Sequence, residues 1–236
     1  MARSVLVVDD EPQIRELLRA YLERDGYAVT EAGTGADALH LTLGAGPPDL
    51  VLLDIGLPDL DGFEVLRTIR RDSEVYVVLV TARADEVDKL VGLSVGADDY
   101  VTKPFSPREV VARVGTVLRR ARTVEPPEED PEVLEFPGLR IDHARREVLT
   151  EAGPAHLSSL QFDLLAALAA DPGRVFSRAQ LLERVWGYDF FGDERVVDVH
   201  VRTLRKVLGD DASDPRVIGT VRGVGYKFLL EPAAAP

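Results

Sequence analysis

Cysteine is absent from this chain of 236 residues, which excludes disulfide bonds and thiolate metal sites. The chain also lacks any apolar run of about 18 residues, the least that a membrane-spanning helix needs. Its N-terminus is not a charged segment followed by an apolar one, as in an export signal. These absences predict a soluble, cytoplasmic protein without a membrane partner.

Basic residues are too few to balance the acidic ones, and the formal net charge is −13. This total argues at first against a nucleic-acid partner. Residues 134–236, however, carry 13 basic and 15 acidic side chains, a net charge of only −2. Because the local distribution of charge governs binding, the C-terminal part remains a candidate for binding nucleic acid.

The first half of the chain alternates short apolar runs with helical patterns. Five β runs alternate with five helices, which predicts a doubly wound α/β domain with a five-stranded parallel sheet over residues 1–122. Three of the predicted strands are apolar throughout, as expected when helices cover both faces of the sheet. The helical stripes are Ile14–Leu22, Ala36–Leu43, Phe63–Ile69, Val87–Val95 and Val110–Leu118.

The second half has a different organisation. Residues 123–133 contain three prolines, five acids and no base, which is typical of an extended charged linker. In residues 134–236, three short strands precede three helices and a closing hairpin, and this order predicts a winged helix-turn-helix domain. The strands are Leu134–Phe136, Leu139–Asp142 and Glu147–Leu149; the helices lie near Leu160–Ala170, Arg178–Val185 and Arg195–Leu208; the hairpin pairs Val217–Val221 with Tyr226–Leu230.

Four of the five β runs of the first domain end in a reactive polar residue. Because ligands bind beyond the carboxyl ends of parallel strands, these residues should meet at one edge of the sheet. Carboxylates suit Mg²⁺, and a carboxylate can also attack phosphorus. Acids at strand ends often only cap the next helix, but capping does not explain a hydroxyl and an ammonium at the same edge. The residues are Asp9, Asp10, Asp54, Thr81 and Lys103.

The motifs around these residues resemble the receiver domain of bacterial two-component response regulators over residues 4–121. The matching segments are Val7-Val8-Asp9-Asp10-Glu11, Asp54-Ile55-Gly56-Leu57-Pro58-Asp59-Leu60-Asp61-Gly62, Thr81-Ala82-Arg83 and Lys103-Pro104-Phe105. The resemblance implies that Asp54 accepts phosphate from a sensor histidine kinase.

The resemblance also implies the roles of the neighbouring residues. Asp10 and Asp54 bind Mg²⁺ through their side chains, Gly56 through its carbonyl, and Asp9 through water. Thr81 and Tyr100 form a switch pair. Lys103 contacts the phosphoryl group, and the Lys103–Pro104 peptide bond is expected to be cis. Many relatives carry a larger residue at the position of Gly56, so the lifetime of the phosphate is left open.

A row of charged residues on the predicted fourth helix, fifth strand and fifth helix resembles the OmpR/PhoB subfamily. In that subfamily the row forms a two-fold homodimer after phosphorylation. The implied contacts are Lys89 with Glu109, Asp99 with Arg113, and Asp98 with Arg120. The alternative is an ordinary solvated face, whose exposed ion pairs contribute only about 0–1 kcal/mol each.

The predicted helix Arg195–Gly209 has an apolar face and a basic face. Val197, Val201, Leu204 and Leu208 share the apolar one. A recognition helix needs an apolar face that packs on its own domain and a basic face that enters the major groove of double-stranded DNA. The alternative is an ordinary amphipathic surface helix, which has the same pattern. His200 lies at the edge of the apolar face, where packing and DNA contact are equally open. The predicted DNA contacts are Arg195, Val199, His200, Arg202, Arg205, Lys206 and, at the tip of the hairpin, Arg222.

Residues 134–230 resemble the OmpR/PhoB effector domain, which adds Thr203 and Thr220 to the expected DNA contacts. The matching segments are Leu157–Leu165, Val175–Leu182, Val196–Val201 and Thr220–Tyr226. Two positions depart from the family pattern: Gln161 replaces the usual glutamate, and Thr203 stands where several relatives have an arginine. The loop Trp186–Glu194 meets RNA polymerase in the family, but Trp186 and Tyr188 could equally pack on the core.

Together these features predict a transcription factor that is phosphorylated on Asp54, dimerises and binds paired DNA half-sites. One alternative is a constitutive DNA-binding protein with a structural receiver domain. An aspartyl-phosphate phosphohydrolase is the enzymatic alternative, but it needs a general acid two residues after the nucleophile, where this chain has Gly56.

Overall fold

The computed structural model describes residues 2–81, 95–123, 133–187 and 194–232; of residues 119–123 it describes the backbone only. The chain divides into two units, Met1–Leu118 and Arg119–Pro236, and each is described by itself. Helix α5 continues to Thr123, and the predicted linker falls largely outside the described residues. In the described part of the chain, no helix combines the length and the apolar character needed to cross a membrane.

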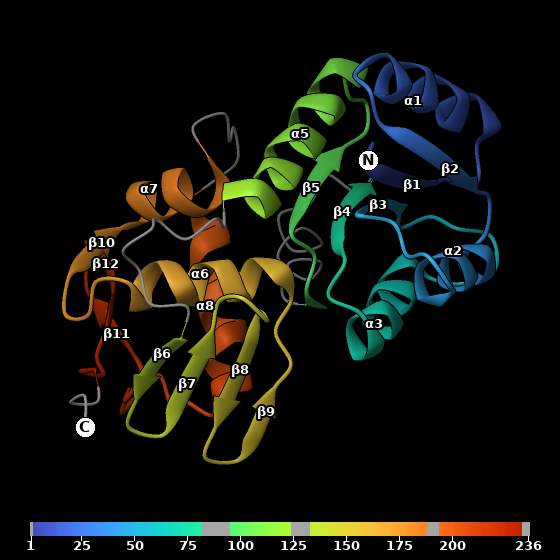
Figure 1. Ribbon diagram of the computed structural model, residues 1–236. Helices are drawn as coiled ribbons and strands as arrows, with labels where there is room; N and C mark the ends of the chain where they lie inside the picture. The colour runs from blue at the N-terminus through green and yellow to red at the C-terminus, as the bar shows by residue number, and fades with distance from the viewer. Residues whose placement is uncertain (1, 82–94, 124–132, 188–193, 233–236) are drawn as a thin grey trace. The chain divides into compact units, whose positions relative to one another are not determined.

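The first unit is a five-stranded parallel sheet, as the sequence predicts, and its strand order is β2-β1-β3-β4-β5. Helices α1 and α5 cover one face, and α2 and α3 cover the other (Figure 1). The strands are β1 (Ser4–Val8), β2 (Ala28–Ala32), β3 (Leu50–Asp54), β4 (Tyr76–Thr81) and β5 (Asp99–Thr102). The helices are α1 (Pro12–Arg24), α2 (Gly35–Leu43), α3 (Gly62–Asp72) and α5 (Pro107–Thr123); the predicted helix Val87–Val95 lies almost entirely outside the described residues.

The core of this unit follows from the period of two in its strands. Val5 and Val7 of β1 pack with Leu18 of α1 and Val114 of α5, and all four side chains are almost completely buried. The residues between them, such as Leu6, face the opposite side of the sheet because successive strand residues alternate. Both faces are therefore apolar, and the polar residues collect where the strands end.

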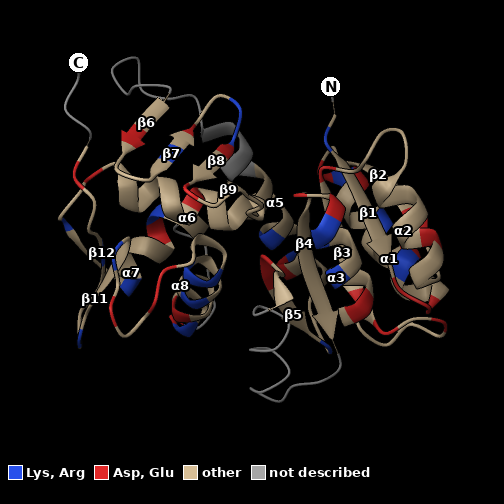
Figure 2. Ribbon diagram, turned by 90° about the horizontal axis from the view of Figure 1, so that it is seen from below, with Lys and Arg blue, Asp and Glu red and all other residues tan. Residues whose placement is uncertain are grey.

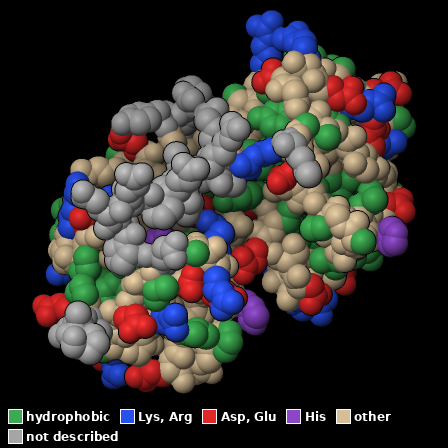
Figure 3. All heavy atoms as spheres, in the orientation of Figure 1, with side chains coloured by type: hydrophobic (Ala, Val, Ile, Leu, Met, Phe, Trp, Pro, Cys, Tyr) green, Lys and Arg blue, Asp and Glu red, His purple; other side chains and the backbone are tan. Residues whose placement is uncertain are grey.

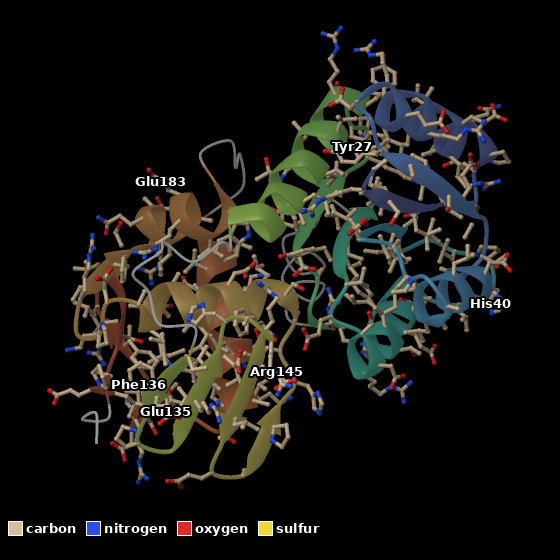
Figure 4. The ribbon with its side chains drawn as sticks, in the orientation of Figure 1. Tyr27, His40, Glu135, Phe136, Arg145 and Glu183 are labelled. Atoms are coloured by element: carbon tan, nitrogen blue, oxygen red, sulfur yellow. The ribbon has the colours of Figure 1, made fainter. Side chains whose placement is uncertain are left out.

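The second unit contains two antiparallel sheets. The first has the order β6-β7-β8-β9 and the second β10-β12-β11. Phe136 of β6, labelled in Figure 4, packs edge-on against Phe228 of β12 with their ring centroids 4.7 Å apart. The strands are β6 (Val133–Phe136), β7 (Leu139–Asp142), β8 (Glu147–Thr150), β9 (Gly153–Ala155), β10 (Val175–Ser177), β11 (Ile218–Val221) and β12 (Gly225–Phe228).

The helices of this unit start where the sequence provides capping residues. Ser158 and Ser177 each form a capping box with a glutamine three residues later, so α6 (Ser159–Ala169) and α7 (Arg178–Leu181) begin there. The second predicted helix is shorter than expected: α7 passes into a π-helical turn, η1 (Leu182–Trp186). The third, α8 (Arg195–Leu208), has the predicted bounds. On the face drawn in Figure 3, acidic and basic side chains are interspersed over both units.

Candidate phosphoacceptor pocket and DNA-binding surface

The strand ends of the first unit bring the predicted polar residues together. Carboxylate oxygens of Asp9, Asp10 and Asp54 all lie within 4.8 Å of one another. Lys103 Nζ donates to Asp9 Oδ2 at 2.8 Å and to Asp54 Oδ2 at 2.9 Å. Asp9, Asp54 and Thr81 are buried, whereas Asp10 is exposed, so the cluster has one open side.

Local hydrogen bonds hold the acidic turn after β1 in place. The backbone N–H of Glu11 donates to Asp9 Oδ1 at 2.9 Å. Arg15 of α1 donates to the carbonyl oxygens of Asp9 and Asp10, at 2.6 and 3.2 Å. The peptide bond between Lys103 and Pro104 is cis, as the family resemblance implies.

Burial and charge act in opposite directions on the pKa values of this cluster. Burial, together with the negative charge of Asp54, raises the pKa of the Asp9 carboxyl. These effects outweigh the charge of Lys103 and the bonds that Asp9 accepts from Lys103 and from the Glu11 backbone, which lower it. For Lys103, burial is the largest single influence and lowers the pKa. The bonds and negative charges of Asp9 and Asp54 together outweigh it, so the pKa of the ammonium is raised. Lys103 is therefore held in its charged form by the carboxylates around it.

The loop from Asp54 to Gly62 is fixed by two features that the sequence pattern did not reveal. A Cβ at Gly62 would lie 2.5 Å from the Asp54 carbonyl oxygen and 2.6 Å from Ile55 Cα, so only glycine fits. Asp59 accepts hydrogen bonds from the backbone N–H groups of Gly35 and Ala36 at the start of α2, at 2.8 and 2.9 Å. These bonds lower the pKa of Asp59 and tie the loop to α2.

The oxygen donors of this cluster fit Mg²⁺, which prefers one or two carboxylates together with water and phosphate oxygens. Three carboxylates in a space of this size repel one another, and a divalent cation would relieve that repulsion. Gly56 lies beside them: a Cβ there would be 3.8 Å from Asp54 Oδ2. The pocket is therefore compatible with a divalent metal.

The predicted dimer residues are only partly available for contacts with a second chain. Arg113 bonds to Asp99 at 3.0 Å and to Glu109 at 3.1 Å within the same chain. Burial is the largest single influence on its pKa and lowers it, but the bonds and charges of the two acids together outweigh burial and raise the pKa. The predicted contact of Asp98 with Arg120 of a second chain does not fit the structure. The Asp98 side chain is fully buried and accepts from Arg70 at 2.7 Å and from the Val77 backbone N–H. Lys89 and the side chain of Arg120 lie outside the described residues.

Helix α8 has the two faces that the sequence predicts. Val197, Val201 and Leu204 are buried, while Leu208 is half-buried. The opposite face exposes three basic side chains and half-exposes Val199, and Figure 2 shows the basic residues along this helix. The exposed basic residues are Arg195, Arg202 and Lys206.

Three of the residues predicted to contact DNA or a protein partner are buried instead. His200 is completely buried and packs against Trp186 with their ring centroids 5.4 Å apart, so the packing alternative holds for both. Arg205 is 8% exposed, and its Nη2 donates to Ile218 O at 2.6 Å. For Arg205 the predicted DNA contact was wrong, because a helical wheel does not show what covers the edge of an apolar face. Tyr188 lies outside the described residues.

The remaining predicted contacts lie at or near the surface. Arg222 and Thr220 are exposed on the hairpin β11–β12, although the Thr220 hydroxyl accepts from Arg205 at 2.8 Å. Thr203 is half-buried, and its hydroxyl accepts from Gln161 Nε2 at 3.3 Å. The two departures from the family pattern thus contact each other.

Sequence reasoning also missed a polar cluster that joins α7, α8 and β12. Asp198 Oδ1 accepts from Arg178 Nε at 2.8 Å and from the Tyr226 hydroxyl at 2.6 Å. Burial and the negative charge of Asp198 raise the pKa of Tyr226 to about 12. The sequence offered one signal, an acid on an otherwise basic face of the recognition helix, but no local pattern connects it to Tyr226.

Comparison with known proteins agrees with both units. Residues 5–115 match the family model "Response regulator receiver domain", and residues 152–228 match "Transcriptional regulatory protein, C terminal". The transcriptional regulatory protein SrrA of Staphylococcus aureus is 41% identical over 240 residues, covering 100% of this chain and 99% of SrrA.

Two solved structures extend the similarity to three dimensions. A mutant of RitR has a TM-score of 0.80 at 28% identity, covering 96% of this chain and 99% of RitR. The Thermotoga maritima response regulator DrrB, an OmpR/PhoB homologue, has a TM-score of 0.52 at 35% identity, covering 97% and 100%. The chain therefore belongs to the OmpR/PhoB family of response regulators, in which a receiver domain controlled by phosphorylation is joined to a DNA-binding domain that regulates transcription.

Proposed function

We propose that Asp54 is the phosphoacceptor and that a sensor histidine kinase is the donor. The observation that carries this proposal is the cluster of three carboxylates within 4.8 Å, with Lys103 bonded to Asp9 and Asp54. Asp54 stands at the end of a fully buried strand, so its carboxylate is presented to the pocket in a fixed position. Lys103 then holds a phosphoryl oxygen, and the buried Thr81 hydroxyl donates to another.

Mg²⁺ would be bound by the side chains of Asp10 and Asp54 and by the Gly56 carbonyl, with Asp9 acting through water. It would supply positive charge that neutralises the phosphoryl oxygens during transfer. Gly56 leaves no acid two residues after Asp54, which favours a signalling phosphate over a hydrolytic enzyme.

The output proposed for the second unit is binding of double-stranded promoter DNA. Exposed basic side chains on α8 and at the tip of the hairpin support it, because such groups bind phosphates and guanine edges. The contacts are Arg195, Val199, Arg202, Thr203, Lys206, Thr220 and Arg222. A cytoplasmic location suits a protein that binds genomic DNA.

Phosphorylation is proposed to act through the switch pair Thr81 and Tyr100 and to favour a homodimer. The proposed contacts of that homodimer are Lys89, the exposed Glu109, the half-buried Arg113 and Asp99, which is only 2% exposed within one chain. Within one chain Arg113 is already paired with both acids, so charge would set the register of the dimer more than its affinity. Sizing chromatography with and without beryllofluoride tests this step, and a monomer under both conditions would exclude it.

The whole proposal is tested by DNA affinity of the wild type and of Asp54→Asn, each with and without acetyl phosphate and Mg²⁺. Tighter binding is expected only for the phosphorylated wild type. Equal binding under all four conditions would instead support a constitutive DNA-binding protein with a structural receiver domain.

A further inference from the structure

The hairpin β11–β12, residues 218–228, is anchored to the recognition helix α8 at two points. The Tyr226 hydroxyl donates to Asp198 Oδ1 at 2.6 Å, and Arg205 Nη2 donates to Thr220 Oγ1 at 2.8 Å. Asp198 and Arg205 are seven residues apart, which is about 10 Å along a helix. Two anchors at that separation fix the direction of the hairpin, whereas a single anchor would leave it free to pivot.

The two anchored hairpin residues lie opposite each other. Thr220 and Tyr226 are cross-strand partners in the antiparallel pair, and only one further pair, Val221 with Gly225, separates them from the tip. Both strands of the hairpin are therefore held at the same level, close to the exposed Arg222. Because the bond between Tyr226 and Asp198 lies only one residue pair from the tip, it restrains the position of Arg222 directly.

Tyr226 is placed to hold its hydroxyl in one direction. The side chain is 6% exposed, and its ring lies beneath two guanidinium groups, with Arg178 5.3 Å and Arg205 5.8 Å from the ring centroid. A pKa of about 12 keeps the hydroxyl protonated, and so a donor, at physiological pH. Arg178 pairs with the same oxygen of Asp198, which offsets the negative charge of an acid on a DNA-binding helix.

We propose that Tyr226 and Asp198 form a positioning pair that sets the hairpin relative to α8, so that Arg222 and the basic face of α8 engage DNA at the same time. This inference rests on the proposed DNA-binding function. It makes the affinity that Arg222 contributes depend on the Tyr226 hydroxyl, although that hydroxyl need not contact DNA. If Tyr226 contacted phosphate directly instead, its contribution and that of Arg222 would be independent.

A double-mutant cycle on the full chain tests the proposal. The probe is a DNA duplex selected by the wild-type chain from a random-sequence library. Arg222→Ala is expected to weaken binding about tenfold in the wild-type background, and less than about threefold in the Tyr226→Phe background. Equal losses in the two backgrounds would overturn the proposal. The matched control is Thr150→Val, which removes a hydroxyl that bonds to Gly153 O in the other sheet; there Arg222→Ala should keep its tenfold effect.

Spin labels provide a readout that needs no DNA. Because the chain has no cysteine, Val207→Cys on α8 and Val224→Cys at the hairpin tip can be labelled specifically; both positions are exposed, at 39% and 49%. Tyr226→Phe should broaden the distribution of distances between the labels, and Thr150→Val should not. An unchanged width in Tyr226→Phe would refute the positioning role. Failure of the wild type to bind any duplex would refute the proposed function, and the label distances would still decide this inference.

Discussion

Replacing Lys103 with methionine removes the ammonium that compensates the acidic pocket while keeping the length of the side chain. At 4.8 Å and an effective dielectric constant of about 20, each pair of carboxylates repels by about 3.5 kcal/mol. Each of the two Lys103 contacts, at 2.8 and 2.9 Å, attracts by about 6 kcal/mol on the same scale. The two attractions by Lys103 thus offset the three repulsions between carboxylates. In Lys103→Met the attractions are lost and the repulsions remain.

Protonation limits the cost of this change. Asp9 already has a raised pKa, and loss of Lys103 raises it further, so it becomes the carboxyl that takes up a proton. Protonating an ordinary aspartate at pH 7 costs about 4 kcal/mol. We therefore expect Lys103→Met to lower the free energy of unfolding of the first unit by about 3–4 kcal/mol at pH 7 without Mg²⁺. Mg²⁺ should restore most of this loss, because it replaces the missing positive charge.

The pH dependence of this loss follows from the same pKa. A carboxyl whose pKa is raised on folding favours the folded state while it is protonated, and this advantage disappears as the pH rises through the raised value. The penalty of Lys103→Met should therefore shrink to about 2 kcal/mol near pH 5.5.

Hydrogen exchange of peptides from β1 and β3, followed by mass spectrometry, measures the stability of the first unit. Tryptophan fluorescence does not, because the single tryptophan, Trp186, lies in the second unit. Lys206→Met, which removes an exposed ammonium on α8, is the control and should leave this exchange unchanged. A penalty below about 1 kcal/mol at pH 7, or one that Mg²⁺ and acid do not reduce, would refute the charge-balance argument.

Three further substitutions test other contacts. Gly62→Ala should destabilise the first unit by about 1–3 kcal/mol and slow phosphorylation by acetyl phosphate, since the added Cβ meets the backbone of Asp54 and Ile55; unchanged labelling and exchange would contradict this. Arg205→Met should cost the second unit about 2–4 kcal/mol in urea titrations followed by Trp186 fluorescence, because Ile218 O loses a buried donor. The raised pKa of Tyr226 stabilises the fold while its hydroxyl is protonated, so the wild type should lose stability between pH 10 and about 12, relative to Tyr226→Phe; parallel thermal unfolding curves over that range would argue against it.

The sequence predicts the acidic pocket well because its geometry follows from the parallel direction of the strands. Once Asp9, Asp54 and Thr81 each end a parallel strand, the fold leaves them no other common place. The short strands β9 and β10 could not be predicted in the same way. Each has three residues, too few for an alternating pattern, and each forms only because a longer strand pairs with it.

Buried charges were the main source of error, and the reason is physical. A helical wheel places Arg205 beside the apolar face but does not show that Ile218 O and Thr220, 13 and 15 residues later, provide acceptors for its guanidinium. Asp98 follows the same rule, since its burial depends on Arg70, 28 residues earlier. Burial of a charge is decided by its partner, and when the partner is distant in sequence no local pattern contains that information.

The contact between Gln161 and Thr203 changes how two departures from the family pattern are understood. Taken singly, Gln161 is an acid replaced by an amide, and Thr203 is a DNA-facing position without its arginine. In the structure Gln161 Oε1 accepts from the Ser158 backbone N–H, Nε2 donates to the Thr203 hydroxyl, and that hydroxyl lies 3.0 Å from His200 O. One side chain thus links the start of α6 to the middle of α8 without any charge. Because a negative and a positive charge are absent together from neighbouring positions, the net charge near the proposed DNA-binding face is the same as in a relative that carries both. Losing the arginine at position 203 therefore leaves no unpaired acid at position 161. The positive charge of the exposed basic residues on α8, such as Arg202 and Lys206, is not reduced by such an acid.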